Sequence, residues 1–525
     1  MSANVVHPVF RALDETGGGK VSVTEILSRL DQAGLPNDDP RLAALTDGLR
    51  RNGSEIDGAT FDRLSQSGRR LLERAVRQEL VLPSFGDFSA TVSRIYEATL
   101  RNEGGALAQY IPQLARVDPD QFGVAVCTID GQRLSLGDAA EPFSFQSSCK
   151  PLLYSAALEL HGEARVHDHI GREPSGQSFN ELTLNKASRP HNPMINAGAI
   201  MSTSLLHADW PMADRFDYLT SLIGNLTGGR RPGFNNAIYH SERETADRNF
   251  ALAHYMREVR AFPEGTDILA TLDLYFAACS IETTAQQMAT IAATYANGGV
   301  CPPTGERVFS GDTVKNCLSM MNACGMYDYS GEFAFRVGMP AKSGVCGAIM
   351  AVVPNVMGIA VWSPHIDQNG NSVRGVEFLH RLVETFNFHN YDSLVETRKL
   401  DPRHRRKTIE SNATFSAIHA ASCGDIDELK RLVAYGHTMD SADYDGRTPL
   451  HLAAAEGHDT AVAFLIRQGV DLAPEDRWGN TPIEDAKRHG HRTVAALIRR
   501  ESGEASSRQS SDRENASTSK PSKAA

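Results

Sequence analysis

The sequence predicts an α+β protein in which an antiparallel sheet packs beside a cluster of helices, with a helical region before it and a stack of helical repeats after it. Two pairs of short β-rich runs, at 122–137 and 347–362, enclose a long stretch of helical composition. A segment near the C-terminus repeats with a period of 33 residues. The predicted parts are a helical region 1–89, a catalytic domain 90–399, a charged linker 400–412, repeats 413–500 and a disordered tail 501–525.

Composition narrows the class of protein. Hydrophobic residues make up 41% and charged residues 22% of the 525 residues, which is typical of globular proteins. The formal charge is 53 − 64 = −11, which disfavours general nucleic-acid binding and favours small-molecule or protein partners.

Membrane insertion and export are not expected. The longest nearly apolar stretch, Gly347 to Trp362, is broken by Pro354 and Asn355 and is shorter than the roughly 18 to 20 residues that cross a bilayer. The first residues show no basic region followed by an apolar run, so the predicted compartment is the cytoplasm. The eight cysteines include no C-x-x-C pair, so we expect reduced thiols and no zinc ribbon.

The helical region at the N-terminus contains one loop with partial calcium-binding spacing. Counting from Asp14, Gly19 and Glu25 occupy the sixth and twelfth positions of an EF-hand loop. The third and fifth positions are Thr16 and Gly18, which lack carboxylates. The pattern therefore predicts a degenerate, metal-free helical pair that packs or dimerises.

The first hairpin leads directly to a serine–lysine pair. Asp130-Gly131 is a signal for a two-residue turn between the strands of 122–137. The motif Gln146-Ser-Ser-Cys-Lys-Pro151 then opens an apolar helical run, with the proline suited to the first turn. Ser147 and Lys150 are three apart and thus neighbours on one helix face. A lysine there can accept the serine proton if burial or nearby positive charge lowers its pKa.

A second motif far along the chain strengthens this pair, because S-x-x-K alone is weak and also occurs at Ser517 to Lys520 in the predicted tail. Lys342-Ser-Gly344 precedes the second hairpin, whose turn is at Pro354-Asn355. A hairpin, an S-x-x-K helix, a helical insert and a K-S-G hairpin follow the chain order of serine β-lactamases and penicillin-binding proteins. The sequence thus predicts that fold for the catalytic domain.

The helical insert carries two polar clusters. His191 to Ile200 contains small residues that allow close approach of a ligand, and Ser241 to Phe250 places Glu242 and Asn249 seven residues apart, on one face of a predicted helix. That face could bind an ammonium together with a carboxamide or carboxylate. Periodicity alone favours a solvated helix surface instead.

Repeats follow the linker. Asp445-Gly-Arg-Thr-Pro-Leu-His451 is echoed by Trp478-Gly-Asn-Thr-Pro-Ile-Glu484, with Thr448 and Thr481 33 residues apart. This period and the Thr-Pro-Leu-His start are typical of ankyrin repeats, and a degenerate third copy begins near Ala413. We expect a minimal stack that binds a protein partner, which the sequence does not identify.

The motifs together resemble the serine-dependent glutaminases, and among them the animal kidney-type, phosphate-activated enzymes with C-terminal ankyrin repeats. The resemblance runs from Tyr110-Ile-Pro-Gln-Leu-Ala115 to Phe386-Asn-Phe-His-Asn-Tyr391 and continues through the repeats. The matching motifs between those limits lie at Gln146 to Pro151, Arg172 to Gly176, His191 to Ile200, Ser241 to Phe250, Phe262 to Asp267, Ala296 to Gly299, Cys324 to Asp328 and Ala341 to Val345.

The resemblance implies an L-glutamine amidohydrolase that acts through a serine acyl-enzyme and needs no metal or cofactor. It makes Ser147 the nucleophile, Lys150 its activating partner and Tyr327 the second proton-transfer group. The backbone N–H groups of Ser147 and Val345 would form the oxyanion hole. The amino-acid end of glutamine would be held by Tyr110, Asn196, Glu242, Asn249 and Tyr275.

The resemblance also bears on regulation and assembly. Residues 176–184 match a gating loop of the family, but Glu181 and Thr183 replace a basic and an aromatic residue of the animal enzymes, so activation by inorganic phosphate is in doubt. The resemblance suggests a homotetramer, and a mitochondrial location only by analogy. Two rivals stay open: a penicillin-recognising type of serine amidohydrolase acting on another amide, and an ankyrin scaffold that carries an inactive hydrolase domain.

Overall fold

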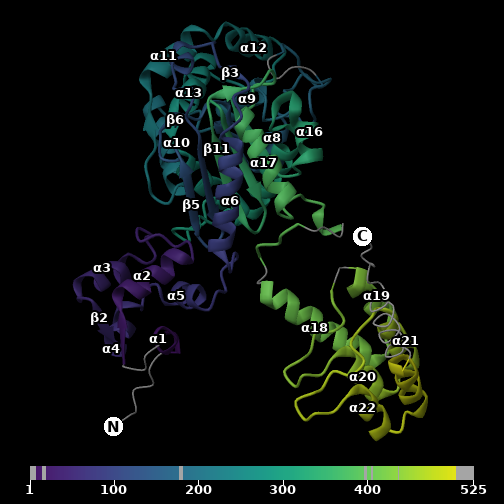
Figure 1. The fold of residues 1–525 in the computed structure, drawn as a ribbon. Helices are drawn as coiled ribbons and strands as arrows, with labels where there is room; N and C mark the ends of the chain where they lie inside the picture. Colours follow the sequence, from purple (N-terminus) through teal and green to yellow (C-terminus); the bar gives the residue numbers. More distant parts are fainter. Residues whose placement is uncertain are drawn as a thin grey trace, which may run out of the picture. The chain divides into compact units, whose positions relative to one another are not determined.

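In a computed structural model of the chain, a five-stranded antiparallel sheet lies at the centre of the first of two units, residues 1–403 and 404–525 (Figure 1). The structure describes residues 8–14, 19–176, 181–394, 399–403, 406–434 and 437–503. Thr16 and Gly18 of the predicted calcium loop, part of the predicted gating loop and all but residues 501–503 of the predicted tail lie outside the described residues.

The sheet joins the two predicted hairpins. Its strand order is β5-β4-β11-β10-β9, and every neighbouring pair is antiparallel. The strands are β4 (Gly123–Thr128), β5 (Arg133–Gly137), β9 (Ala341–Gly344), β10 (Ala348–Val353) and β11 (Met357–Trp362).

Helices cover both faces of this sheet, as the predicted α+β fold requires. Residues such as Ala125, Met350 and Ala360 face the helical cluster, whereas Val124 and Ile359 face the other side. Burial on both faces explains why the central strands are continuous apolar runs without polar alternation. On the first face α14 (Ala285–Ala296) packs directly on the sheet. The helices that share its apolar core are α8 (Lys150–His167), α9 (Asn196–Ser204), α13 (Ile268–Ser280) and α15 (Gly311–Cys324). The core of the second face includes α6 (Phe85–Thr99) and α17 (Val373–Thr385).

One turn differs from its prediction. Between β4 and β5 the Thr128 N–H donates to the Gln132 carbonyl oxygen, which leaves three residues in the loop instead of two. Gly131 has φ +84°, the left-handed conformation that a three-residue hairpin loop needs at that position. The turn at Pro354-Asn355 links β10 to β11 as expected.

Further helices and short strands complete this unit. They are α7 (Pro112–Ala115), α10 (Met212–Leu226), α11 (Asn236–Glu244), α12 (Asp247–Glu258), α16 (Ser330–Arg336), η1 (Gln146–Cys149), η2 (Tyr327–Tyr329), η3 (Asp392–Leu394), the paired strands β3 (Ala106–Leu107) and β12 (His365–Ile366), and the small sheet of β6 (Phe143–Ser144), β8 (Ile281–Thr283) and β7 (Gly233–Phe234).

The N-terminal region is helical, as predicted, and has its own apolar core. A short ladder of β1 (Lys20–Ser22) and β2 (Glu55–Asp57) joins its two halves. In the predicted calcium loop the Asp14 carboxylate accepts a hydrogen bond from the Gly19 N–H at 2.8 Å. Its helices are α1 (Pro8–Leu13), α2 (Val23–Gln32), α3 (Ala43–Arg51), α4 (Gly58–Leu64) and α5 (Arg69–Val76).

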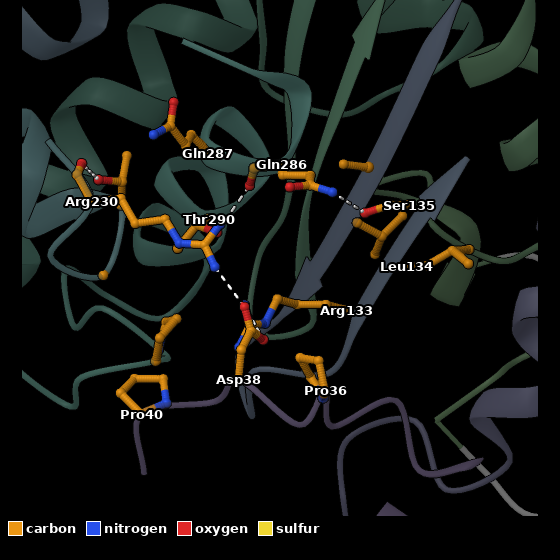
Figure 2. A pocket seen from close by; sticks show the side chains of 15 residues that line it. Pro36, Asp38, Pro40, Arg133, Leu134, Ser135, Arg230, Gln286, Gln287 and Thr290 are labelled. Carbon is orange, nitrogen blue, oxygen red and sulfur yellow. Dashed lines mark hydrogen bonds and ion pairs between the residues drawn. The ribbon is translucent and has the colours of Figure 1, made fainter. Parts of the chain in front are cut away.

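This region contacts the β4–β5 hairpin. The Arg74 guanidinium donates to both oxygens of Asp130, at 2.6 and 2.9 Å. Residues of this region and of the body of the domain also line a cavity of about 470 Å³, in which Asp38 pairs with Arg230 at 2.6 Å and lies 3.6 Å from Arg133 (Figure 2). The N-terminal region is therefore seated on the hairpin through specific polar contacts.

The predicted boundary after residue 89 falls inside α6. Phe88 of this helix packs on Phe386 with a centroid separation of 5.2 Å, and α6 belongs to the core of the sheet. A boundary before Phe85 fits this packing better. At the other end, α18 (Arg406–Cys423) begins inside the predicted linker.

The second unit is a stack of helical pairs with its own core, as the 33-residue period predicts. In the Thr448-Pro-Leu-His451 motif, the buried His451 accepts the Thr448 N–H and its other ring nitrogen lies 3.1 Å from the Asn480 carbonyl oxygen of the next repeat. The helices are α18, α19 (Ile426–Ala434), α20 (Pro449–Glu456), α21 (Asp459–Arg467), α22 (Pro482–Arg488) and a last one over 492–503. Among the residues described, no helix has the length and apolarity needed to cross a membrane.

Candidate active site

Ser147 and Lys150 meet at the junction of η1 and α8. The Lys150 ammonium nitrogen lies 2.6 Å from the Ser147 hydroxyl oxygen. Lys150 is fully buried, whereas Ser147 is partly exposed. The serine lies on a 3₁₀ turn and the lysine starts the α-helix, with Pro151 in its first turn as the sequence predicts. The spacing thus produces a direct contact between the predicted nucleophile and the predicted proton acceptor.

Two buried lysines share this site. Burial lowers the pKa of Lys150, although nearby Cys279, Cys149 and Glu242 partly oppose this effect. Burial and the positive charge of Lys150 lower the pKa of Lys342 well below its ordinary value. A lysine that loses its proton more readily can accept one from a serine near neutral pH. The pKa of Lys150 is thus shifted in the direction that S-x-x-K chemistry needs.

Tyr327 is also next to Ser147. It starts η2 with φ +54°, a backbone conformation that is uncommon for a bulky residue. Burial raises the pKa of Tyr327, and a hydrogen bond with Ser147 partly offsets that shift. The Lys342 nitrogen lies 4.5 Å from the centre of its ring. The raised pKa keeps the Tyr327 phenol protonated near neutral pH, next to the Ser147 hydroxyl.

Gly344 lies where the end of β9 packs against the turn that carries Ser147. It is the last residue of β9. A Cβ at Gly344 would lie 3.0 Å from the Phe145 carbonyl oxygen and 3.4 Å from the Ser148 nitrogen. A larger residue would therefore push the strand end, and with it Val345, away from Ser147.

A buried carboxylate lies at the other end of the site. Glu242 on α11 is 8% exposed, and the Tyr110 hydroxyl donates to its Oε1 at 2.5 Å. The same hydroxyl lies 2.6 Å from Gln146 Oε1. Burial raises the pKa of Glu242, and hydrogen bonds from Tyr110 and Gln146 hold the shift back. A buried carboxylate beside a site for small molecules is suited to pair with an ammonium.

Three further predicted residues form a hydrogen-bonded chain. The Asn196 amide donates to Asn249 Oδ1 at 3.1 Å, and Tyr275 donates to Asn196 Oδ1 at 3.3 Å. They come from the starts of α9 and α12 and from the middle of α13. Amide and phenol groups of this kind can bind a carboxylate or a carboxamide.

The prediction that Glu242 and Asn249 share one helix face is wrong. Helix α11 ends at Glu244, and α12 begins at Asp247 after a two-residue break. Thr245 at the end of α11 bonds its hydroxyl to the Ser241 carbonyl oxygen at 2.9 Å. The two residues therefore belong to successive helices, and Glu242 is buried at the site instead of lying on a solvated surface.

Sequence reasoning missed Gln146 and used Lys342 only as a fold marker. Gln146 has φ +49° and contacts Tyr110, so it connects the nucleophile turn to Glu242. No spacing rule predicts that contact, because the two residues are 36 apart. The K-S-G motif was the signal for Lys342, whose burial against Lys150 becomes visible only in the fold.

A cavity of about 500 Å³ lies next to Tyr327 and extends to Gly176, where the predicted gating loop begins. Its wall includes Asn192 and Asp328. Within the described parts of the chain, no group of three or more His, Cys, Asp or Glu side chains is arranged to hold a metal ion.

Comparison with known proteins agrees with this geometry. The sequence pattern of the glutaminase family matches residues 105–391, which include every site residue described above. The chain belongs to the glutaminase family. It is 45% identical over 457 residues to the mitochondrial liver isoform of glutaminase from Mus musculus, covering 86% of this chain and 76% of that one. It is 43% identical over 466 residues to putative glutaminase 3 of Caenorhabditis elegans, covering 86% and 80%.

Solved structures and the flanking regions extend the comparison. The probable glutaminase ybaS superposes with a TM-score of 0.55 at 36% identity, covering 57% of this chain and 97% of that one. Mglu in its glutamate form gives a TM-score of 0.54 at 39% identity, covering 56% and 67%. An EF-hand domain matches residues 5–83, and three ankyrin repeats match residues 417–508. The glutaminase fold, the EF-hand-like region and the ankyrin stack expected from the sequence are thereby confirmed.

Proposed function

We propose that this glutaminase hydrolyses L-glutamine to L-glutamate and ammonia through a Ser147 acyl-enzyme. The observation that carries the proposal is the 2.6 Å contact between Lys150 and Ser147 in a family member whose buried Glu242 lies at the same site. One end of the site can activate a nucleophile and the other can bind an ammonium. L-Glutamine carries its reactive carboxamide and its ammonium at opposite ends.

In the first half-reaction, the Ser147 oxygen attacks the carboxamide carbon and Lys150 accepts the hydroxyl proton. The N–H groups of Ser147 and Val345 donate to the oxygen that becomes negative in the tetrahedral intermediate. Tyr327 passes a proton to the leaving nitrogen, the C–N bond breaks, and ammonia departs. A glutamyl ester on Ser147 remains.

In the second half-reaction, water attacks the ester carbonyl and the same groups act in reverse order. The Tyr327 phenolate accepts a proton from the water, and Lys150 returns its proton to the Ser147 oxygen as the ester bond breaks. The products are L-glutamate and the free enzyme. Lys150 and Tyr327 carry every proton in this scheme, which involves no metal.

The amino-acid end of the substrate is held by two groups of residues. Glu242 pairs with the ammonium, while Tyr110 fixes the position of its carboxylate. The chain of Asn196, Asn249 and Tyr275 binds the substrate carboxylate. Binding at this end places the carboxamide over Ser147 and so orients it for attack by the hydroxyl oxygen.

We further propose a homotetramer located in the cytoplasm, with an ankyrin stack that binds a protein partner. The family resemblance supports the tetramer, and the repeat architecture supports the protein partner. Light scattering after size-exclusion chromatography measures the oligomer, and a mass other than four chains would contradict the proposal.

The test of the activity compares wild type with Ser147→Ala and, as a matched control, Ser148→Ala. Ser148 is the adjacent serine, and its hydroxyl donates to the Phe145 carbonyl oxygen away from the reaction. We expect wild type and Ser148→Ala to release ammonia and glutamate from L-glutamine, and Ser147→Ala to release neither while folding normally. Adding inorganic phosphate to each assay shows whether the altered gating loop still responds to that anion.

Two results would contradict the proposal. Substantial turnover by Ser147→Ala would remove Ser147 from its role. A folded wild type that leaves glutamine intact but hydrolyses a β-lactam such as nitrocefin would favour the penicillin-recognising alternative, and one that hydrolyses neither would favour the inactive scaffold.

A further inference from the structure

Two cysteine sulfurs that the proposed reaction does not use lie directly behind the nucleophile. Cys149 ends η1, and Cys279 is in the last turn of α13. Their Sγ atoms are 3.9 Å apart, and the two residues are 2% and 4% exposed. The residues are 130 positions apart in the chain, so the fold alone brings them together.

This pair differs chemically from the other buried thiols. Burial raises the pKa of Cys127, Cys317 and Cys346 to about 12 each, so those thiols stay protonated and inert. Burial also opposes ionisation of Cys149, but the hydrogen bond from Cys279 and the charges of Lys150 and Lys342 outweigh it and lower the Cys149 pKa.

The pKa of Cys279 shifts in the opposite direction. Its hydrogen bond to Cys149 and its burial raise its pKa well above the ordinary value. Of the two sulfurs, Cys149 therefore ionises more readily, and Cys279 keeps its proton. A thiolate next to a second thiol is the arrangement that oxidises to a disulfide.

Both cysteines are joined to active-site residues through short pieces of backbone. Cys149 lies two residues after Ser147 and directly before Lys150. Cys279 lies one helical turn after Tyr275, whose ring centre is 5.6 Å from the Lys150 nitrogen. Because Ser147 is partly exposed, a small oxidant that enters the substrate site comes within one 3₁₀ turn of the Cys149 sulfur.

We propose that Cys149 and Cys279 form a reversible disulfide under peroxide and that this bond switches the enzyme off. The Cys149 thiolate attacks one oxygen of hydrogen peroxide, which breaks the O–O bond and gives a sulfenic acid and, after protonation, water. The Cys279 sulfur then attacks the Cys149 sulfur and expels a second water. Two thiols lose two electrons in total, and the peroxide is reduced to two waters.

The bond changes the geometry of the reaction site. A disulfide has an S–S distance of about 2.05 Å, so the sulfurs must approach by roughly 1.9 Å from their separation of 3.9 Å. That approach pulls η1 and α13 together and disturbs the 2.6 Å contact of Lys150 with Ser147. Since a misplacement of about 1 Å in an active site can cost on the order of 100-fold in rate, we expect at least a tenfold loss of kcat/KM.

The inference rests on the proposed function, and the experiment separates the two. Full-length wild type, Cys149→Ala, Cys279→Ala and Cys423→Ser are treated with hydrogen peroxide and then with dithiothreitol. Cys423 is the exposed cysteine in the other unit and serves as the matched thiol control. Glutamate release is expressed as the ratio of treated to untreated enzyme, and non-reduced digests are analysed by mass spectrometry for linked peptides.

We expect wild type and Cys423→Ser to lose at least tenfold in activity, to recover it with dithiothreitol, and to contain a peptide that links Cys149 to Cys279. Cys149→Ala should keep its activity, and neither pair variant should give the linked peptide. Inactivated wild type without that peptide, or equal sensitivity of Cys149→Ala, would overturn the proposal. If untreated enzyme has no glutaminase activity, the proposed function fails, while the linked peptide still decides whether the disulfide forms.

Discussion

Replacing Glu242 by Gln tests the substrate end of the site with minimal change in shape. The glutamine side chain keeps an oxygen that can accept the Tyr110 hydrogen bond, now 2.5 Å long, and it fills the same volume. Only the negative charge is lost. Because Glu242 is 8% exposed, water cannot replace the missing partner of the substrate ammonium.

The size of the effect follows from this burial. A hydrogen bond to a charged group contributes about 1.5–3 kcal/mol, which corresponds to roughly 10- to 150-fold in affinity. The ammonium is bound equally in the ground state and the transition state, since it is remote from the scissile bond. We therefore expect KM to rise by this factor and kcat to change by less than about threefold.

Steady-state glutamate release from L-glutamine measures both constants. Glu244→Gln, on the same helix but exposed, is the matched control and should match wild type. A KM unchanged in Glu242→Gln, or a large fall in kcat with normal KM, would refute the assignment of Glu242 to the ammonium.

Other predictions concern the base, the repeats and the N-terminal region. Lys150→Arg should lower kcat by roughly 10²- to 10⁴-fold, because arginine stays charged and accepts no proton. In wild type, kcat/KM should rise with pH through the lowered pKa of Lys150 and then level off. A rate that falls over that pH range would exclude Lys150 as the base. Deleting residues 404–525, which form a separate unit, should leave glutamine turnover near wild type, and a folded but inactive truncation would show that the units depend on each other. Asp130→Asn should lower the free energy of unfolding by roughly 1.5–3 kcal/mol in a urea titration, because Asp130 accepts two hydrogen bonds from Arg74 and one from a backbone N–H. The control Asp312→Asn, at an exposed ion pair, should change it little.

Local features of this chain were predictable because short spacings determine them. Ser147 and Lys150 are three residues apart at a helix start, so their contact follows from helical geometry. The ankyrin stack follows from a 33-residue period, since each unit buries its apolar face only against the next one. The β10–β11 hairpin follows from two apolar runs around Pro354-Asn355.

The substrate end was not predictable from spacing, because its residues come from separate elements. Tyr110 and Glu242 are 132 positions apart and meet only after α11 has folded against the body of the domain. Periodicity favoured a solvated surface for Glu242, and the break at Thr245 removes the single helix on which that inference depended. Only the family resemblance pointed to these residues, because it carries information about tertiary contacts that one sequence does not.

The charge of Glu242 at the substrate end of the site affects the pKa of Lys150 at the reaction end. Lys150, Lys342 and Glu242 are all buried, and the negative charge of Glu242 helps Lys150 to keep its proton in the free enzyme. If the substrate ammonium pairs with Glu242 as proposed, that support is neutralised, and we expect the pKa of Lys150 to fall further when glutamine binds. The pKa seen in kcat, which reports the complex, should then be lower than that seen in kcat/KM, which reports the free enzyme. In Glu242→Gln the carboxylate is absent from both the free enzyme and the substrate complex, so the pKa values seen in kcat and in kcat/KM should converge. If these two values stay as far apart as in wild type, substrate binding does not act on Lys150 through Glu242.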